Sequence, residues 1–349
     1  VVTLFRGPRS YTGEDVVEIS CHGSTYVAQR ILDVLLAQGA DPAEPGEFTR
    51  RAFINGRIDL SRAEAIADLI QAKTEASRRV SLSQVRGTLY KRIQSMRREL
   101  IEACSYLELE LDFSEEDIEF ASKEKLESML SRLRATIHDI SSTYERGRVC
   151  REGVTLVITG KPNVGKSSLL NTLAERERAI VTPIPGTTRD TISEVLDLNG
   201  ICFTITDTAG IRKTEDAVEQ EGVNRAGTAI EGADIVLALF DGSSPFDEDD
   251  YRVLDLLQEA PGHKLAALNK CDLETLPVPE PLRSRISEND YFFLSALTGQ
   301  GISRLVSQLE QHVLSEGIPG PEEVLITHAR QKAALNEAAS AICEAEKGL

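Results

Sequence analysis

Residues 160–167 read Gly-Lys-Pro-Asn-Val-Gly-Lys-Ser and constrain the fold more than any other stretch of this chain. They follow an apolar run at residues 154–159 that is typical of a strand, and Leu169, Leu170 and Leu173 after them are spaced as on one helix face. A glycine-rich turn between a strand and a helix is the setting that a P-loop requires. The alternative is a glycine-rich turn that binds no ligand.

A P-loop supplies the groups that bind a phosphate chain. Its glycines let the backbone wrap closely, so that N–H groups point at one phosphate at a helix N-terminus. We expect Lys166 to reach the β- and γ-phosphates, where it is also catalytic, and the Ser167 hydroxyl to bind Mg²⁺. The residues expected to contact the nucleotide here are Asn163, Val164, Gly165, Lys166, Ser167 and Ser168.

Two later motifs indicate guanine. Asn269-Lys270-Cys271-Asp272 ends the apolar run 265–268, which places it at the carboxyl end of a buried strand, where ligands bind in open α/β sheets. The Asp272 carboxylate can accept hydrogen bonds from both N1–H and the 2-amino group of guanine, so it is the expected specificity residue. Ser295-Ala296-Leu297, after the predicted strand 291–294, is expected to offer backbone N–H groups to the guanine O6.

Two further segments fit a nucleotide sensor. Asp207-Thr208-Ala209-Gly210 closes the predicted strand 202–206 and is expected to contact the γ-phosphate and, through a water molecule, Mg²⁺. Residues 186–190 read Gly-Thr-Thr-Arg-Asp and resemble a first switch, in which Thr187 and Thr188 contact the nucleotide and Thr188 binds Mg²⁺. Each segment alone could be an ordinary capped loop, but their order along the chain is that of a GTPase.

The catalytic position departs from the Ras type, which has a glutamine directly after the Asp-x-x-Gly glycine. Ile211 stands there and cannot orient a water molecule. Carboxylates follow at Glu215, Asp216, Glu219 and Glu221. They either supply the missing group or simply solvate a loop, as charge runs usually do.

Beyond these motifs, the chain resembles the MnmE (TrmE) family of tRNA-modifying GTPases over nearly its whole length. The residues that carry this resemblance are 10–15 (Ser-Tyr-Thr-Gly-Glu-Asp), 45–53 (Pro-Gly-Glu-Phe-Thr-Arg-Arg-Ala-Phe), Asn55-Gly56, Asp59-Leu60 and 63–70 (Ala-Glu-Ala-Ile-Ala-Asp-Leu-Ile). Other P-loop GTPases do not share these segments.

The resemblance implies an α/β multi-domain protein with a Ras-like, doubly wound GTPase domain inserted into an α-helical domain. The implied parts are a tetrahydrofolate-binding α+β domain at 1–55, helical segments at 56–148 and 319–349, and the GTPase domain at 149–318. The implied activity is K⁺-activated GTP hydrolysis in carboxymethylaminomethyl-type modification of the tRNA wobble uridine.

Site residues follow from the same resemblance. Glu219 is the implied catalytic residue that orients the attacking water. K⁺ replaces an arginine finger, with implied ligands Asn163, Thr182, Ile184 and Thr187. A 5-formyl- or 5,10-methylene-tetrahydrofolate is the implied one-carbon cofactor, with Arg51, Phe53 and Asn55 as its expected contacts.

The implied partners are tRNA, an FAD- and NADH-dependent flavoprotein (MnmG) and a second copy of the chain. That copy is expected to pair through the N-terminal domain, and the GTPase domains are expected to pair when GTP and K⁺ bind. The runner-up hypothesis is an Era-like switch that uses GTP as a timer in ribosome assembly. The chain begins and ends inside the family pattern, so we expect a fragment that lacks the family's C-terminal Cys-x-Gly-Lys motif.

Composition agrees with a cytoplasmic protein of two or three domains. No apolar run approaches the length of a membrane span. The six cysteines are scattered without a Cys-x-x-Cys pair, and no His/Cys cluster has metal-binding spacing. A net charge of −17 argues against broad, nonspecific binding of nucleic acid, so any RNA contact must be local.

Periodicity predicts the other elements. We expect strands at 1–5 and 16–21, a helix at 26–38 ended by Gly39, and a helix that starts with a Ser61–Glu64 capping box. Longer helices are expected on the apolar positions Val85, Leu89, Ile93, Met96, Leu100, Cys104, Leu107 and Leu111, at 126–144 and at 324–342.

Two local features complete the predictions. Asn199-Gly200, between strands at 192–198 and 201–205, is a type I′ hairpin signal and gives the sheet an antiparallel edge. Arg79, Arg86 and Arg97 are separated by near-whole helical turns and form one basic stripe, which is either an RNA contact or an ordinary solvated helix face.

Overall fold

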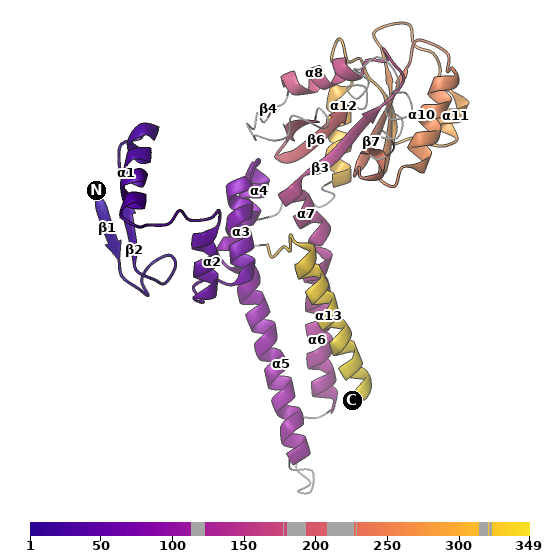
Figure 1. The fold of residues 1–349 in the computed structure, drawn as a ribbon. Coiled ribbons are helices and arrows are strands. Elements are labelled where there is room, and N and C mark those ends of the chain that lie inside the picture. The colour runs from indigo at the N-terminus through magenta and orange to yellow at the C-terminus, as the bar shows by residue number, and fades with distance from the viewer. Residues whose placement is uncertain are drawn as a thin grey trace.

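The computed structural model describes residues 1–112, 123–176, 178–179, 193–207, 227, 229–313, 320 and 323–349. Long helices run away from a seven-stranded sheet, and a small N-terminal unit lies beside the helices (Figure 1). In the part of the chain described, no helix combines the length and apolarity needed to cross a membrane.

The large sheet has the strand order β4-β5-β6-β3-β7-β8-β9. Its strands are β3 (Val154–Thr159), β4 (Arg178–Ala179), β5 (Ser193–Leu198), β6 (Ile201–Asp207), β7 (Ile235–Asp241), β8 (His263–Asn269) and β9 (Tyr291–Phe293). The strands from β6 to β9 pair in parallel, whereas β5 pairs antiparallel with both β6 and β4. Asn199 and Gly200 have φ of 50° and 92°, which confirms the predicted hairpin.

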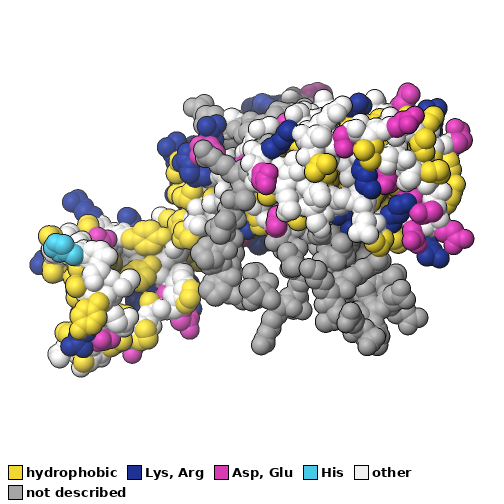
Figure 2. Space-filling view, turned by 90° about the horizontal axis from the view of Figure 1, so that it is seen from above, with side chains coloured by type: hydrophobic (Ala, Val, Ile, Leu, Met, Phe, Trp, Pro, Cys, Tyr) yellow, Lys and Arg dark blue, Asp and Glu magenta, His cyan; other side chains and the backbone are white. Residues whose placement is uncertain are grey.

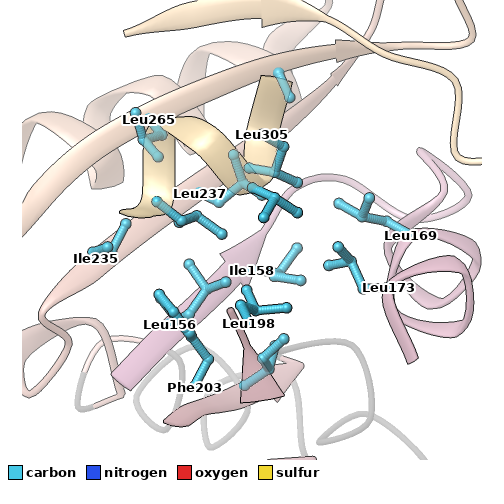
Figure 3. Packing of buried hydrophobic residues seen from close by; sticks show 14 of the residues in the cluster. Leu156, Ile158, Leu169, Leu173, Leu198, Phe203, Ile235, Leu237, Leu265 and Leu305 are labelled. Atoms are coloured by element: carbon cyan, nitrogen blue, oxygen red, sulfur yellow. The ribbon is translucent and has the colours of Figure 1, made fainter. Parts of the chain in front are cut away.

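Helices cover both faces of this sheet. The helices are α8 (Lys166–Arg176), α10 (Glu248–Glu259), α11 (Glu280–Arg283) and α12 (Ile302–Val313). Leu156 and Ile158 of β3 pack with α8 and α12, as Figure 3 shows, and Val157 packs with α10 on the opposite face. Because neighbouring residues of a strand point to opposite faces, each face has its own apolar core. The predicted doubly wound architecture is confirmed.

A third core joins helices from both ends of the sequence. The helices here are α3 (Leu60–Gln71), α4 (Glu75–Val85), α5 (Thr88–Asp112), α6 (Lys123–Ser142), α7 (Tyr144–Glu152) and α13 (Ala329–Gly348). Leu89 and Met96 of α5, Leu133 and Ile137 of α6, and Leu335 of α13 belong to one buried cluster. The sheet is therefore inserted between helices that share a core.

The predicted capping box at Ser61 and Glu64 is wrong. Helix α3 begins at Leu60, and the N-cap is Asp59, whose carboxylate accepts the Arg62 N–H at 3.1 Å. Aspartate is as good an N-cap as serine, and it stands two residues earlier. Glu64 instead accepts two hydrogen bonds from Arg330, each of 3.1 Å.

The predicted basic stripe is also wrong, because the arginines lie on different helices. Helix α4 ends at Val85 and α5 begins at Thr88, and between them Gly87 has a φ of 79°. Arg79 on α4 is paired with Glu75 at 2.9 Å. The turn interrupts the helical periodicity between α4 and α5, so Arg79, Arg86 and Arg97 do not lie on one helix face.

Two apolar patterns are narrower than predicted. On α5 the buried residues Leu89, Met96 and Ala103 recur every seven positions, whereas Ile93 and Leu100 are exposed. The α5 helix packs mainly on α6, so only a narrow seam is covered. Helix α13 begins at Ala329 rather than at 324, because the Leu325 carbonyl accepts a hydrogen bond from Gln84 of α4 and the Ile326 N–H donates to Thr143, the N-cap of α7.

The N-terminal unit consists of β1 (Val2–Phe5), β2 (Val16–Ile19), α1 (Thr25–Ala37) and α2 (Glu47–Ile54). The two strands pair antiparallel, and Ser24 caps α1 by accepting the Val27 N–H. No residue of α1 is buried. The predicted strands and helix are present, but most of their apolar side chains face outward.

Candidate functional site

The P-loop connects β3 to α8 at the carboxyl edge of the sheet. Three of its residues have positive φ, namely Gly160 at 153°, Asn163 at 59° and Gly165 at 106°. A Cβ added at Gly165 would lie 2.2 Å from Nδ2 of Asn269, so only glycine fits there. The loop is therefore wrapped tightly in front of the first turn of α8, with backbone N–H groups at a helix N-terminus.

Lys166 lies at the start of α8 and is 6% exposed. Its Nζ donates hydrogen bonds to the carbonyl oxygens of Gly160 at 2.7 Å and Lys161 at 2.8 Å. Ser167, Ser168 and Asn163 are exposed to solvent. The ammonium is thus held under the loop, whereas the neighbouring hydroxyl and amide groups are accessible to a ligand.

Asn269, the last residue of β8, joins the P-loop to the Ser295–Leu297 segment. Its side chain is 3% exposed. Its Nδ2 donates to the Val164 carbonyl at 2.7 Å, and its Oδ1 accepts the Ala296 N–H at 2.9 Å. A buried amide with both ends bonded fixes the two segments relative to each other.

Lys270 has a φ of 66° and forms an ion pair of 2.6 Å with Asp241, the last residue of β7. Asp241 also accepts hydrogen bonds from the backbone and hydroxyl of Ser243. Burial favours a higher pKa for Asp241, but Lys270 and Ser243 outweigh it and hold the pKa below its usual value. Asp241 is therefore a charged partner that orients Lys270.

The remaining guanine candidates lie at the same edge. Asp272 is exposed one turn beyond Lys270, and Leu297 is 84% exposed. Ser295 is fully buried, and its hydroxyl accepts the Thr298 N–H at 3.1 Å, which shapes the turn after β9. The structure thus places the P-loop, the Asn269–Asp272 motif and the Ser295–Leu297 segment side by side.

Several expected site residues lie outside the described part of the chain. These are Thr182, Ile184, Thr187, Thr188, Thr208, Ala209, Gly210 and Glu219. The backbone of Asp207 ends β6 next to β3, which puts this residue at the P-loop edge, but its side chain is not described.

The expected folate residues lie on or just after α2. Arg51 is paired with Glu47 at 2.6 Å and with Glu14 at 3.4 Å. Asn55 donates to the Thr12 carbonyl at 2.8 Å, and the Phe53 side chain is 41% exposed. The segments around residues 10–15 and 45–55 therefore meet in space, as parts of one surface.

One feature of the site was missed in the sequence. Lys161 in the P-loop contacts Asp247 at 2.8 Å and Asp250 at 2.7 Å, at the N-terminus of α10. These aspartates form the capping box of that helix. The Asp-x-x-Asp spacing before an apolar helix signals the cap, but nothing in it signals a contact with residue 161.

Comparison with known proteins gives the family. A sequence model described as the MnmE helical domain matches residues 60–349, and one described as the GTP-binding protein TrmE N-terminus matches residues 1–57. The tRNA modification GTPase MnmE of Syntrophotalea carbinolica is 45% identical over 97% of this chain and 73% of its own length. This chain belongs to the MnmE family of tRNA modification GTPases.

Other MnmE relatives agree. MnmE of Geobacter sulfurreducens is 44% identical over 100% of this chain and 76% of its own length. MnmE of Acetivibrio thermocellus is 42% identical over 98% of this chain and 74% of its own length. Among solved structures, Era of Aquifex aeolicus bound to GDP and AlF4⁻ has a TM-score of 0.36 at 25% identity, over 54% of this chain and 66% of that one. The predicted MnmE resemblance is confirmed, and the chain is a GTPase of this family rather than an Era-like switch.

Proposed function

We propose that this MnmE family member binds GTP between the P-loop, Asp272 and the Ser295–Leu297 segment and hydrolyses it to support modification of the tRNA wobble uridine. Asp272 selects guanine, Lys166 binds the β- and γ-phosphates, and Glu219 orients the attacking water. The four proposed domain parts keep the boundaries 1–55, 56–148, 149–318 and 319–349.

One observation carries the nucleotide site. Asn269 bonds the P-loop through Val164 and the Ser295–Leu297 segment through Ala296, so the phosphate-binding and base-binding parts are held as one unit. Such preorganisation means that little ordering remains when the nucleotide binds.

The side chains present also fit the proposed metal ions. Ser167 offers an exposed hydroxyl at the N-terminus of α8, and Asn163 offers an exposed amide oxygen in the loop. Oxygen ligands of this kind suit Mg²⁺ and K⁺. Bound ions supply positive charge that offsets the charge on the transferred phosphoryl group. We assign Mg²⁺ to Ser167, Thr188 and, through water, Asp207, and K⁺ to Asn163 and the carbonyls of Thr182, Ile184 and Thr187.

The modification itself requires more than GTP. We assign to a flavoprotein of the MnmG type the redox step, and to a one-carbon tetrahydrofolate the transferred carbon. Arg51, Phe53 and Asn55 are the proposed folate contacts, supported by the accessible Phe53 ring and by the hydrogen bond from Asn55 to the Thr12 carbonyl, which joins the two segments that carry the family pattern. With a net charge of −17, the chain contacts tRNA only locally.

A second copy of the chain is the proposed partner of the N-terminal unit. Figure 2 shows hydrophobic side chains gathered on this unit, and Val2, Leu4, Val17 and Val34 are each more than half exposed. Contiguous exposed apolar surface is typical of an interaction site. The GTPase domains pair as well when GTP and K⁺ bind.

The decisive experiment compares GTP hydrolysis in K⁺ and in Na⁺, with and without the flavoprotein. We expect a rate roughly 10²-fold higher in K⁺, because a positive charge placed at the phosphates has an effect of that order. Asn163→Ala should abolish the difference while nucleotide affinity stays nearly unchanged. Asn171→Ala, at an exposed position on the same helix as Lys166, is the matched control and should keep the K⁺ effect.

Equal rates in both salts would remove K⁺ from the mechanism. Two results together would show that GTP hydrolysis is not coupled to the tRNA reaction. The flavoprotein would leave the rate of GTP hydrolysis unchanged, and Lys166→Ala would still modify the wobble uridine at the wild-type level.

A further inference from the structure

In the part of the chain that the structure describes, side chains of β8 and α10 contact the P-loop from outside. Asn269 holds its second half through the Val164 carbonyl. Its first half is held through Lys161, whose ammonium contacts Asp247 and Asp250 of α10. The side chain of Lys161 is 15% exposed, that of Asp250 is 2% exposed and that of Asp247 is 57% exposed. The buried contact is therefore the one to Asp250.

The two carboxylates are fixed by their own helix. Asp247 accepts the N–H groups of Asp249 and Asp250 at 3.1 Å each, and Oδ2 of Asp250 accepts the Asp247 N–H at 3.1 Å. Within the residues that the structure describes, Oδ1 of Asp250 has no hydrogen-bond partner. The negative charge of Asp250 is thus balanced chiefly by Lys161.

Lys161 stays charged in this position. Its burial favours a lower pKa, but the hydrogen bonds to Asp247 and Asp250 outweigh burial and raise the pKa above its usual value. A charged hydrogen bond with little access to water is stronger than one on the surface.

We propose that Lys161 and Asp250 are positioning residues for nucleotide binding: their ion pair fixes the first half of the P-loop in its phosphate-binding shape. This inference rests on the proposed binding of a guanine nucleotide at the P-loop. It adds to that site a residue pair outside the motifs that define it.

The geometry of the loop explains why such a restraint matters. Gly160 and Gly165 leave the loop backbone conformationally free, so contacts from its surroundings are needed to fix it in one shape. The Lys161 carbonyl also accepts a hydrogen bond from Lys166 at 2.8 Å. Lys161 therefore connects α10 to the lysine that reaches the phosphates, in the same way that Asn269 connects β8 to Val164.

The test is a double-mutant cycle on the full chain, read by the Kd of a fluorescent GDP analogue, by the KM and kcat of GTP hydrolysis and by thermal unfolding. Lys161→Met keeps the stem and removes the charge without touching α10. Asp250→Asn keeps an acceptor for the Asp247 N–H. Each single change should raise the Kd about tenfold, because one charged hydrogen bond is lost.

The double variant should also bind about tenfold more weakly than wild type, because the second change removes a partner that is already unpaired. KM should rise with kcat nearly constant, and Lys161→Arg should restore affinity. Lys264→Met, on β8 at the opposite edge of the sheet, and Asp247→Asn, at the exposed carboxylate, are the controls and should change the Kd less than about threefold.

The inference would be overturned if Lys161→Met bound the nucleotide with wild-type affinity. It would also be overturned if the increase in Kd in the double variant were the product of the increases in the two single variants. A lower unfolding temperature at unchanged Kd would also overturn it, since that describes a structural role alone. If Lys161→Met does not fold, the inference is tested by comparing Asp250→Asn with Asp247→Asn. Only Asp250→Asn should then raise the KM and the Kd. Failure of the wild-type chain to bind GDP would contradict the proposed function instead.

Discussion

Two buried side-chain amides brace two different parts of this molecule. Asn269 bonds the P-loop to the segment after β9. Both lie at the carboxyl edge of the sheet, where we propose that GTP binds and which we call the nucleotide edge. Gln84, which is 3% exposed on α4, bonds the Leu325 carbonyl at 3.0 Å and the Thr327 hydroxyl at 3.2 Å. Both amides fix segments that are far apart in the sequence, and removing either would leave buried polar groups unpaired.

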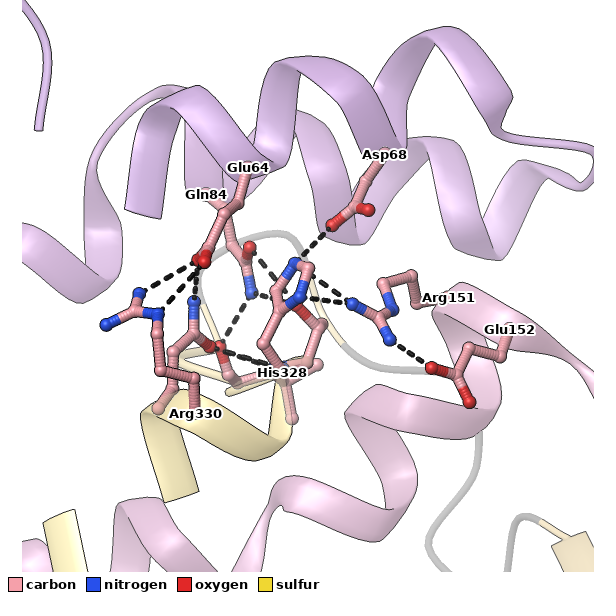
Figure 4. A network of polar contacts seen from close by, with 10 residues as sticks. Glu64, Asp68, Gln84, Arg151, Glu152, His328 and Arg330 are labelled. Carbon is pink, nitrogen blue, oxygen red and sulfur yellow. Dashed lines mark hydrogen bonds and ion pairs between the residues drawn. The ribbon is translucent and has the colours of Figure 1, made fainter. Parts of the chain in front are cut away.

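The surroundings of the two amides differ. Asn269 lies beside exposed groups that a ligand can reach, such as Ser167 and Asp272. Gln84 lies in a network that links the helices before and after the sheet, which Figure 4 shows with Glu64, Asp68, Arg151, His328 and Arg330. In this network, His328 Nε2 lies 3.0 Å from Asp68 Oδ2.

The comparison assigns the two regions different tasks. The nucleotide edge prepares a site for a ligand, whereas the Gln84 network joins the helices before the sheet in the sequence to the segment after it. Substitutions of the exposed groups at the edge should therefore change kinetics or affinity with little effect on stability, and substitutions in the network should do the reverse.

The largest effect is expected at the nucleotide edge from Glu219→Ala. Because Ile211 cannot orient water, loss of the Glu219 carboxylate should lower kcat by about 10² to 10⁴-fold with little change in nucleotide affinity. Glu215→Ala and Glu221→Ala are the controls, and steady-state kinetics is the measurement. A loss in either control that equals the Glu219→Ala loss would move the assignment elsewhere in the acidic stretch.

Asp272→Asn tests the base end of the same edge. The carboxylate accepts two guanine donors, so its loss should weaken GTP binding by about 10²-fold and favour xanthosine triphosphate, whose 2-oxo group accepts from the new amide. Glu274→Gln, an equally exposed change nearby, should leave both affinities as they are. Undiminished GTP affinity in Asp272→Asn would contradict the guanine assignment.

The sequence predicted the nucleotide edge better than the helical junction, and the reason is physical. Phosphate and base recognition need particular residues at short, fixed spacings, as in residues 160–167 and 269–272, so the site leaves a local pattern. Gln84 and Thr327 are 243 residues apart, and nothing local marks such a pair.

The same limit explains the errors in the helices. Glu64 fits a local cap in the sequence because its partner, Arg330, lies far along the chain. The contact of Lys161 leaves no local signal either, because Asp250 lies 89 residues along the chain. Periodicity located α5 but could not show that α6 covers only the narrow face with Leu89 and Met96.

Gly147→Ala tests the helical junction at its tightest contact. A Cβ at this position on α7 would lie 2.1 Å from the Ile326 carbonyl oxygen, so the backbone of the segment before α13 must shift. We expect a loss of about 2 kcal/mol in the free energy of unfolding, well above the gain from better helix propensity.

Chemical denaturation followed by circular dichroism measures this loss, and kcat should stay near the wild-type value. Gly348→Ala is the matched control, because no atom lies within 4 Å of its added Cβ, and it should not destabilise the chain. A large fall in kcat for Gly147→Ala at unchanged stability would break the proposed division between the two regions.

Gln84→Met should give the smallest of these effects, a loss of about 1 to 2 kcal/mol from the two groups left unpaired on the 325–327 segment. The reactivity of Cys150 reports on opening of this junction, because its thiol is buried with Val80 and Leu325. Burial raises the pKa of Cys150 from 9.0 to about 11, so the folded chain keeps it unreactive at pH 8. Thiol labelling followed by mass spectrometry should show Cys150 modified about tenfold faster in Gln84→Met, with exposed Cys21 unchanged as the internal reference.

The same thiol gives this prediction a pH dependence. A pKa raised by folding means that ionisation favours the unfolded chain, so the stability that the neutral thiol contributes is present below pH 9 and is lost as the pH rises toward 11. Cys150→Ala should therefore flatten the fall in stability across this window, whereas Cys104→Ala, at an exposed position, should leave the fall unchanged. Equal labelling of Cys150 in the wild-type chain and in Gln84→Met would show that Gln84 does not hold this junction closed, and the parallel with Asn269 would then fail.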